Sequence, residues 1–226
     1  MDSSFQELQL VTVWSSPSSY EVAQFISKIL SHHKGNSENT LPLQLHFVDA
    51  TNSFPIAQFK KIVPVSEETK YIYDNIRITT CLDITELNRT VNRMIQLISI
   101  DQLQRYSRIK NGITDREADT ASGTSGILLI INGLEVMFRN SQINESQEQA
   151  HLLLRDVMLR LRATANQPDG NNDLQLKNII IFPSSELFRY VSNNNNTKKR
   201  IKSNNTIKGN TLGEYVSKFY ADEMIS

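Results

Sequence analysis

The stretch ILLIINGLEVMFRN, residues 127–140, decides the fold of this chain. Five apolar residues run without a break into Asn132 and Gly133. Because a continuous apolar run cannot face water on either side, it predicts a central strand covered by helices on both faces of a sheet. A second interpretation is open, since Asn-Gly between apolar runs also favours a β-hairpin turn. The flanks, however, do not alternate apolar and polar residues as a half-buried hairpin does.

The polar end of this stretch indicates whether the strand could help to bind a metal ion. In nucleotide-binding α/β proteins, such a strand usually ends in a carboxylate that helps to hold Mg²⁺ beside the phosphates. Asn132 stands at that position, and an amide has no negative charge to place beside a divalent cation. The stretch therefore predicts the frame of an ATPase without its metal chemistry.

Composition limits the possible classes of protein. The 226 residues can bury a sizeable core, and 24 basic residues balance 24 acidic ones. Any affinity for nucleic acid must therefore come from a local patch. The single cysteine, Cys81, excludes an internal disulfide and favours a reducing compartment. The sequence predicts neither a membrane span nor a signal peptide.

Apolar patterns along the chain predict alternating strands and helices. This alternation is typical of the α/β class, with a mostly parallel central sheet, right-handed crossovers and helices on both faces. We expect strands at residues 8–14, 43–50, 75–82, 127–131 and 178–182, and helices at residues 20–30, 55–63, 86–106 and 147–165, with Asp83 or Thr85 capping the third helix.

The turn after the first strand lacks the residues of a phosphate-binding loop. Such a loop needs glycines, whose backbone N–H groups wrap a phosphate, and a lysine that neutralises it. Neither residue type occurs between Trp14 and Gln24, where the chain reads SSPSS before the helix. Serines at a helix start are more simply N-caps.

Few other residues qualify as candidates for a site. Phe54, between a turn and a helix, has two open interpretations: a residue of the core, or an aromatic anchor for a partner protein. Cys81 is most simply a small buried apolar residue. The sequence predicts no catalytic residues, no cofactor and no metal site.

The largest electrostatic feature is a basic loop at about residues 189–208. No acidic residue lies between Glu186 and Glu214. The loop follows the last buried strand, at the edge where α/β proteins bind ligands, so its cations could neutralise phosphates. Past Tyr190 it holds no aromatic residue, which predicts binding with little sequence preference. The candidate DNA-binding residues are Arg189, Lys198, Lys199, Arg200, Lys202 and Lys208.

Other interpretations of this loop are open. It could be a solvated tether, because charged polar loops often are. The run KKRIK at residues 198–202 could also be a nuclear-import patch, which does not exclude DNA binding.

Taken together, these segments resemble the RecA-like recombinase core over nearly the whole chain. HFVDATNSFP, from His46, resembles the second strand of that family and its acidic turn, with Thr51 where the family carries its catalytic glutamate. The stretch with Asn132 resembles the magnesium-site strand, and the basic loop falls where the family has its second DNA-binding loop. The resemblance implies a single RecA-like domain over residues 1–226 with a degenerate nucleotide site, and no ATP hydrolysis.

A closer resemblance is to the Csm-type recombinase paralogue of the fungal Shu complex. The phrases LQLVTVWSSP, FVDATNSFP, NIRITTCLD, INGLEVMFRNSQ, LLRD and EYVSKFYAD carry it, jointly and in order. It implies a nuclear, non-catalytic subunit that pairs with a second RecA-like subunit and with the smaller members of the complex. Together they would bind forked or single-stranded-tailed DNA, contact recombinase paralogues, and help the recombinase filament to assemble during homologous recombination and error-free lesion bypass.

Two rival functions are open. The chain could be a scaffold of that complex without direct DNA contact, in which case the basic loop only tethers. It could also be a divergent nucleotide-binding ATPase that uses an unrecognised loop.

Overall fold

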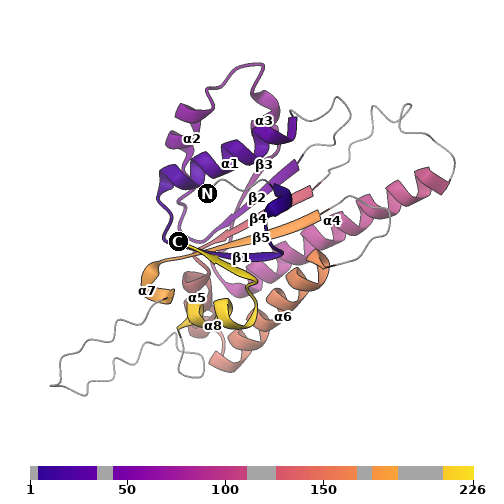
Figure 1. Ribbon diagram of the computed structural model, residues 1–226. Helices are drawn as coiled ribbons and strands as arrows, with labels where there is room; N and C mark the ends of the chain where they lie inside the picture. The colour runs from indigo at the N-terminus through magenta and orange to yellow at the C-terminus, as the bar shows by residue number, and fades with distance from the viewer. Residues whose placement is uncertain (1–4, 35–42, 111–125, 167–174, 188–210) are drawn as a thin grey trace.

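The computed structural model describes residues 5–34, 43–110, 126–166, 175–187 and 211–226, which form a RecA-like α/β core (Figure 1). The described strands make one six-stranded parallel sheet in the order β3-β2-β4-β5-β1-β6, which confirms the predicted class. The strands are β1 (Val11–Ser15), β2 (Leu43–Asp49), β3 (Ile76–Thr80), β4 (Gly126–Asn132), β5 (Gln175–Phe182) and β6 (Glu223–Ile225). The helices are the 3₁₀ turn η1 (Phe5–Glu7), then α1 (Ser19–Lys34), α2 (Ile56–Ile62), α3 (Lys70–Asp74), α4 (Ile84–Lys110), α5 (Leu134–Asn144), α6 (Gln147–Ala165), α7 (Ser184–Leu187) and α8 (Leu212–Phe219).

Strand β4 lies inside the sheet, between β2 and β5. The hairpin interpretation of Asn132 and Gly133 is therefore wrong, because both neighbours of β4 run parallel to it. Gly133 instead turns the chain from β4 into α5, with a φ of +78° that favours glycine. A Cβ at this position would also lie 3.0 Å from the Cβ of Ala50 and 3.0 Å from Cγ2 of Thr51. The glycine thus serves a strand-to-helix turn.

The sheet separates two hydrophobic cores. Alternation along β4 sends Ile127, Leu129 and Ile131 to one core and sends Leu128 and Ile130 to the other. All five side chains are buried, as the unbroken apolar run predicted. The first core contains buried residues of α4, α5, α6 and α8, and the second contains residues of α1, α2, α3 and η1.

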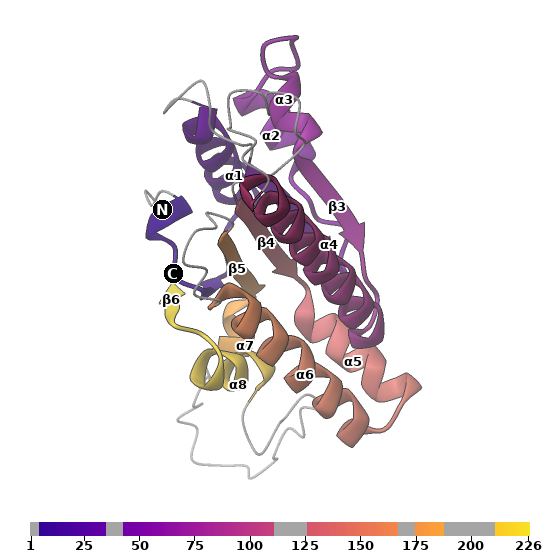
Figure 2. The ribbon, with the colours of Figure 1, turned by 90° about the vertical axis from the view of Figure 1, so that its right-hand side faces the viewer.

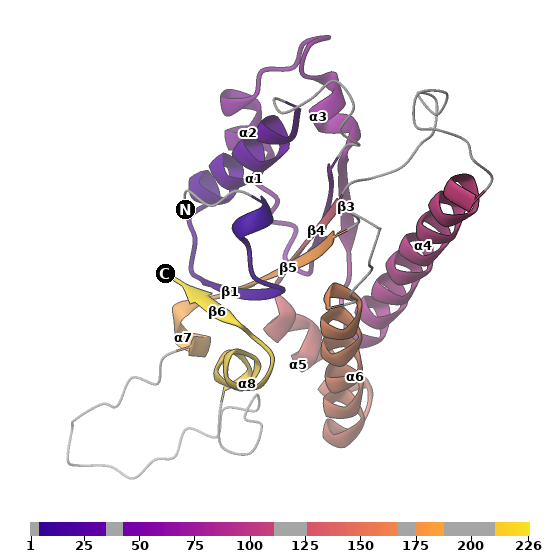
Figure 3. The ribbon, with the colours of Figure 1, turned by 45° about the vertical axis from the view of Figure 1, so that its right-hand side comes forward.

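The helices form one layer on each face of this sheet, as Figures 2 and 3 show from two sides. Helices α1, α2 and α3 cover one face, whereas α4, α5, α6 and α8 cover the other. The far end of α4 extends past the strands (Figure 1). The two termini lie near each other because the short strand β6 pairs with β1.

Several elements differ from the sequence-based expectations. Strand β1 begins at Val11 rather than at residue 8, and α4 continues to Lys110. Asp83 caps α4, since its Oδ1 accepts a hydrogen bond of 2.8 Å from the N–H of Glu86. The sequence analysis did not predict η1, α3, α5, α7, α8 or β6. Most are too short to carry a clear apolar period, and β6 has only three residues.

Candidate nucleic-acid interface at the carboxyl edge of the sheet

The parallel strands bring their carboxyl ends to one edge of the sheet. Asp49, the last residue of β2, stands opposite Thr80 of β3 and Asn132 of β4. At the far side of β5, Ser15 of β1 stands opposite Phe182. In open α/β sheets this edge is where ligands bind, so the chemistry of its side chains decides what the fold can do.

A polar cluster closes the edge between β2 and β4. We call it the Asp49 cluster, and it consists of Asp49, Thr51, Ser53 and Asn132. The side-chain Nδ2 of Asn132 lies 3.1 Å from Oδ1 of Asp49, 3.0 Å from Oγ1 of Thr51 and 2.7 Å from Oγ of Ser53. The amide of Asn132 therefore donates hydrogen bonds into the cluster, at the position where nucleotide-binding α/β proteins usually carry a magnesium-binding carboxylate.

Both carboxylate oxygens of Asp49 accept hydrogen bonds from this turn. The N–H and the hydroxyl of Thr51 each donate to Oδ1 over 2.8 Å, and the N–H of Ser53 donates to Oδ2. Burial raises the pKa of Asp49, but the hydrogen bonds from Thr51, Ser53 and Asn132 outweigh it, so the pKa lies below its ordinary value. Asp49 is therefore a charged structural anchor for the turn after β2.

Thr51 lies inside the same cluster. It was expected where the RecA-like family carries its catalytic glutamate, and its hydroxyl donates to Asp49. The side chain of threonine carries a hydroxyl instead of a carboxylate, and a hydroxyl does not take a proton from water. Thr51 therefore cannot replace that base. Asn132 and Thr51 are two positions at which the sequence differs from the pattern of the RecA-like ATPases. The structure places both of them in one hydrogen-bonded cluster.

The turn between β1 and α1 is closed in a similar way. The N–H and the hydroxyl of Ser18 both donate to Oε2 of Glu21 over 2.7 Å, and the N–H of Glu21 donates to Oγ of Ser18 over 3.2 Å. This is a capping box, which confirms the N-cap interpretation of the serines. The hydrogen bonds from Ser18 lower the pKa of Glu21. A carboxylate of the chain itself thus lies at the helix N-terminus, where a phosphate-binding loop would place its anion.

Ser16 ties this turn to the start of α7. It adopts a φ of +45°, which is uncommon for a residue other than glycine. Its Oγ accepts hydrogen bonds from the N–H of Ser184 over 2.6 Å and from the Ser184 hydroxyl over 2.8 Å. The turn after β1 is therefore held by contacts within the protein on both of its sides.

The predicted DNA-binding residues, Arg189, Lys198, Lys199, Arg200, Lys202 and Lys208, lie outside the described residues. The flanks of that segment are described, and they meet at Glu186. The hydroxyl of Thr211 donates to the backbone carbonyl of Glu186, and the N–H of Leu212 donates to Oε2 of the same residue over 3.2 Å. At Gly213, a Cβ would lie 2.5 Å from the Glu186 carbonyl oxygen. We call these contacts the Glu186 clamp.

The Glu186 clamp lies close to the carboxyl edge of the sheet. Helix α7, which carries Glu186, starts two residues after Phe182 at the end of β5. Helix α8 then begins with a capping box formed by Thr211 and Glu214. The two described flanks, which end at Leu187 and resume at Thr211, are thus held together at Glu186.

Phe54 packs against the core on the face of α2. Its ring is half-buried and lies edge-on to the ring of Phe47, with centroids 5.1 Å apart, and 6.1 Å from the ring of Phe59. These contacts agree with the interpretation as a core residue.

The remaining candidates are structural. Cys81 is buried, with Sγ 3.3 Å from Oγ1 of Thr90, and burial raises the pKa of its thiol. Within the described ranges, no group of three or more His, Cys, Asp or Glu side chains could hold a metal ion. None of the helices described is both long and apolar enough to cross a membrane.

The sequence analysis did not single out Asp49. The signal was present, because an aspartate at a strand end followed by Thr and Ser at the second and fourth positions is typical of a side-chain-capped turn. The Glu186 clamp had no such signal, since it joins residues 25 and 26 positions apart across the basic segment.

Comparisons with known proteins cover nearly the whole chain. Residues 11–221 match the family model described as "Shu complex component Csm2, DNA-binding". "Chromosome segregation in meiosis protein 2" of Saccharomyces cerevisiae is 38% identical over 225 residues, covering 97% of this chain and 98% of the relative. The protein of the same name from Candida glabrata is 34% identical over 224 residues, covering 97% of each chain. The chain therefore belongs to the Csm2 family of Shu complex components.

Proposed function

We propose that this chain, as one domain, is a non-catalytic DNA-binding subunit of a Shu-type complex. In this role it promotes assembly of the recombinase filament in homologous recombination and error-free tolerance of DNA damage. The description of its family as a DNA-binding component of that complex supports the proposal. The name of its relatives, which refers to chromosome segregation in meiosis, supports an action in the nucleus.

One observation carries the non-catalytic part of the proposal. At the edge where a nucleotide would bind, Asp49, Asn132 and Thr51 bond to one another. Glu21 holds the N-terminus of α1 in its capping box with Ser18. Phosphoryl transfer needs a phosphate cradle, a metal site and a base or positioned water together. At the described edge, these polar groups already form hydrogen bonds with one another within the protein.

The DNA-binding part rests on charge and on the Glu186 clamp. Phosphate contacts dominate protein–DNA affinity and need clustered cations more than a rigid surface. The segment 188–210 supplies six cations and no acid, namely Arg189, Lys198, Lys199, Arg200, Lys202 and Lys208. Because the clamp joins its flanks at the carboxyl edge, the segment would present these cations on one side of the sheet. The equivalent loop of the second RecA-like subunit in the heterodimer would extend the same surface.

Two protein contacts complete the proposal. A second RecA-like subunit forms the heterodimer, and smaller subunits of the complex join it. Phe54, whose ring is half-buried, would contact a recombinase paralogue through its exposed part, since a partly exposed aromatic beside a turn is a common anchor.

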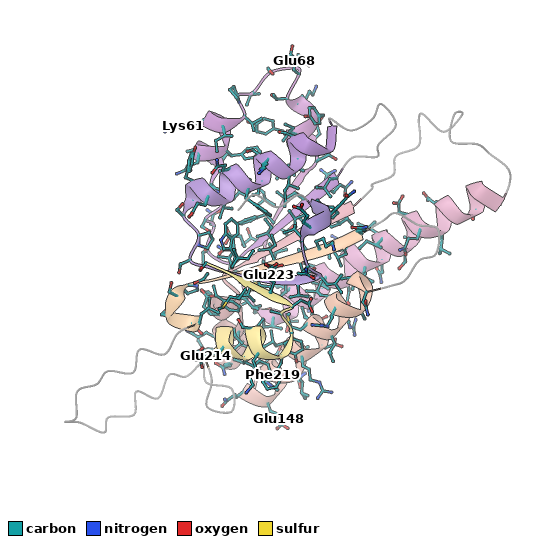
Figure 4. The ribbon with its side chains drawn as sticks, viewed as in Figure 1. Lys61, Glu68, Glu148, Glu214, Phe219 and Glu223 are labelled. Atoms are coloured by element: carbon teal, nitrogen blue, oxygen red, sulfur yellow. The ribbon has the colours of Figure 1, made fainter. Side chains whose placement is uncertain are left out.

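The test is DNA retention by the heterodimer purified with its partner. The variant Lys198→Glu/Lys199→Glu/Arg200→Glu reverses three charges of the segment, and Lys60→Glu/Lys61→Glu on α2 is the control. Figure 4 shows Lys61 on the side of the molecule opposite Glu214 of α8, which follows the segment. We expect the triple variant alone to lose binding to single-stranded-tailed DNA. Unchanged retention would favour the scaffold function instead.

Calorimetry with ATP and Mg²⁺ tests the other rival function. The closed Asp49 cluster and the capping box at Glu21 lead us to expect no heat of binding at micromolar nucleotide. Micromolar affinity would favour a divergent ATPase and would contradict the non-catalytic assignment.

A further inference from the structure

Strand β3 forms one border of the sheet (Figure 2). Its only neighbour among the described strands is β2, with an unbroken parallel register from Ile76 to Thr80. Border strands commonly carry a proline, a lysine or a bulge, which keeps other strands from pairing with them. The five residues of β3 include neither proline nor lysine, and the register shows no bulge. The backbone of β3 is therefore open to pairing with another strand.

Two hydrogen bonds show which backbone groups of β3 face away from β2. The carbonyl of Asn75 accepts from the N–H of Leu45 over 2.9 Å, and the N–H of Cys81 donates to the carbonyl of Asp49 over 3.2 Å. In a parallel ladder, every second residue of a strand bonds to a given neighbour, so every second residue from Asn75 to Cys81 bonds to β2. The N–H and C=O groups of the residues between them point outward, namely those of Ile76, Ile78 and Thr80.

The same border carries an apolar side chain near Phe54. Ile78 stands opposite Phe47 in the register of β2 and β3, so the two side chains lie on one face of the sheet. The ring of Phe54 packs on that face too, with its centroid 5.1 Å from that of Phe47. Ile78 is 50% exposed, since no described strand lies on the outer side of β3. We call Ile78, Phe54 and the outward backbone groups of Ile76, Ile78 and Thr80 the β3 edge.

We propose that the β3 edge binds an extended segment of the protein that contacts Phe54, and that this segment pairs with β3 as an added strand. Main-chain hydrogen bonds to the outward groups would supply affinity. The segment would carry apolar residues at every second position, so that one of them packs on Ile78 and on the exposed part of Phe54. This inference rests on the proposed contact between Phe54 and a recombinase paralogue.

The backbone pattern selects an extended strand over other ligands. The outward groups alternate donors and acceptors along β3, and an extended backbone presents the complementary groups at the same spacing. DNA phosphates offer acceptors alone, so they would leave the outward carbonyls unpaired. The backbone groups of a helix are already bonded to one another, so a docked helix would leave both kinds unpaired. Continuity with the contact proposed at Phe54 favours the paralogue over a second copy of this chain.

The experiment titrates the recombinase paralogue into the heterodimer of the full chain and its second RecA-like subunit. Thr80→Pro removes one outward N–H and keeps the bonds to β2, whereas the matched control Thr80→Ala keeps that N–H. We expect Thr80→Pro to weaken binding at least about tenfold, and Thr80→Ala to change it less than about twofold. Ile78→Thr keeps the backbone but removes apolar contact, and should weaken binding at least about threefold. Circular dichroism checks that each variant is folded.

Hydrogen exchange of the native chain gives a second measurement, which decides the matter if Thr80→Pro does not fold. The amides of Ile78 and Thr80 should exchange fast in the heterodimer and at least about tenfold more slowly once the paralogue is added. The amides of Arg77 and Thr79 bond to β2 and should exchange slowly in both states.

Several results would overturn the added strand. One is equal binding by Thr80→Pro and Thr80→Ala together with unchanged exchange. If Phe54→Ala still weakens binding in that case, the contact at Phe54 stands and this inference alone fails, whereas a paralogue that does not bind the native heterodimer removes both. Slow exchange of Ile78 and Thr80 before the paralogue is added would also contradict the proposal. It would identify a second copy if it depends on protein concentration, and a segment within the heterodimer if it does not.

Discussion

The substitution Asn132→Asp tests the closed Asp49 cluster directly. It replaces the Nδ2 group, 3.1 Å from Oδ1 of Asp49, with a second carboxylate oxygen. At about 3 Å and an effective dielectric constant of about 20 to 40, two charges repel by about 3–5 kcal/mol. Proton uptake limits this cost, since protonating a carboxyl at pH 7 requires about 1.4 kcal/mol for each unit by which the pH exceeds its pKa. We therefore expect the free energy of unfolding at pH 7 to fall by about 2–4 kcal/mol.

The pH dependence gives the signature of this repulsion. The folded state raises the pKa of the new carboxyl pair above its unfolded value. The destabilisation is therefore largest above the folded pKa, shrinks as the pH falls through it, and is gone below the unfolded pKa. Urea unfolding at pH 7 and pH 4.5 measures both values, and the difference between Asn132→Asp and the native chain should be smaller at pH 4.5.

Two matched variants separate the contributions. Asn132→Ala removes the donor without adding charge and should cost about 1–2 kcal/mol. The exchange Asp49→Asn/Asn132→Asp restores one carboxylate beside one amide, and should be more stable than Asn132→Asp alone. If Asn132→Asp unfolds at the same urea concentration as the native chain at pH 7, the amide does not hold the cluster closed and the reasoning fails.

Three further predictions concern other parts of the edge. Gly213→Ala places a methyl group 2.5 Å from the Glu186 carbonyl, and should lower the unfolding free energy by about 1–3 kcal/mol in urea titrations; an unchanged midpoint would refute the clamp. Ser18→Ala removes the capping box with Glu21 and should cost about 1 kcal/mol, whereas equal thermal stability would show that the cap is dispensable. The folded pKa of Asp49 lies below its unfolded value, so the charged Asp49 stabilises the fold above about pH 4, and this stabilisation is lost as the pH falls through the folded pKa. The variant Asp49→Asn should therefore show a smaller loss of unfolding free energy at acidic pH than the native chain. An equal loss in both proteins would contradict this.

Local patterns were enough to predict the frame of the fold. The unbroken run before Asn132 required burial on both faces, and the structure confirms a central parallel strand there. Ser18 and Asp83 were predictable as caps because an N-cap bonds to a residue only three positions away. Such short-range signals depend on neighbours along the chain and not on the rest of the fold.

The chemistry of the edge could be predicted only in part. That Asn132 and Thr51 lack the charges of an ATPase was visible, but their bonding to Asp49 depends on the register of β2 against β4. This register joins residues 83 positions apart, and no local pattern specifies it. The Glu186 clamp likewise depends on where α8 packs, because its bonds bridge the whole basic segment.

The central proposal is that the basic loop at about residues 189–208 binds the DNA backbone by charge. Its most direct test is the salt dependence of DNA affinity, measured by titrating the heterodimer into labelled DNA at salt concentrations from about 50 to about 200 mM. If about four phosphates are neutralised, log K against log salt should have a slope of about −3.5. Replacing Lys198, Lys199 and Arg200 with glutamine should reduce the magnitude of this slope by about 2.7, because each neutralised phosphate contributes about 0.9. A slope near zero, or one that the triple variant leaves unchanged, would contradict the account.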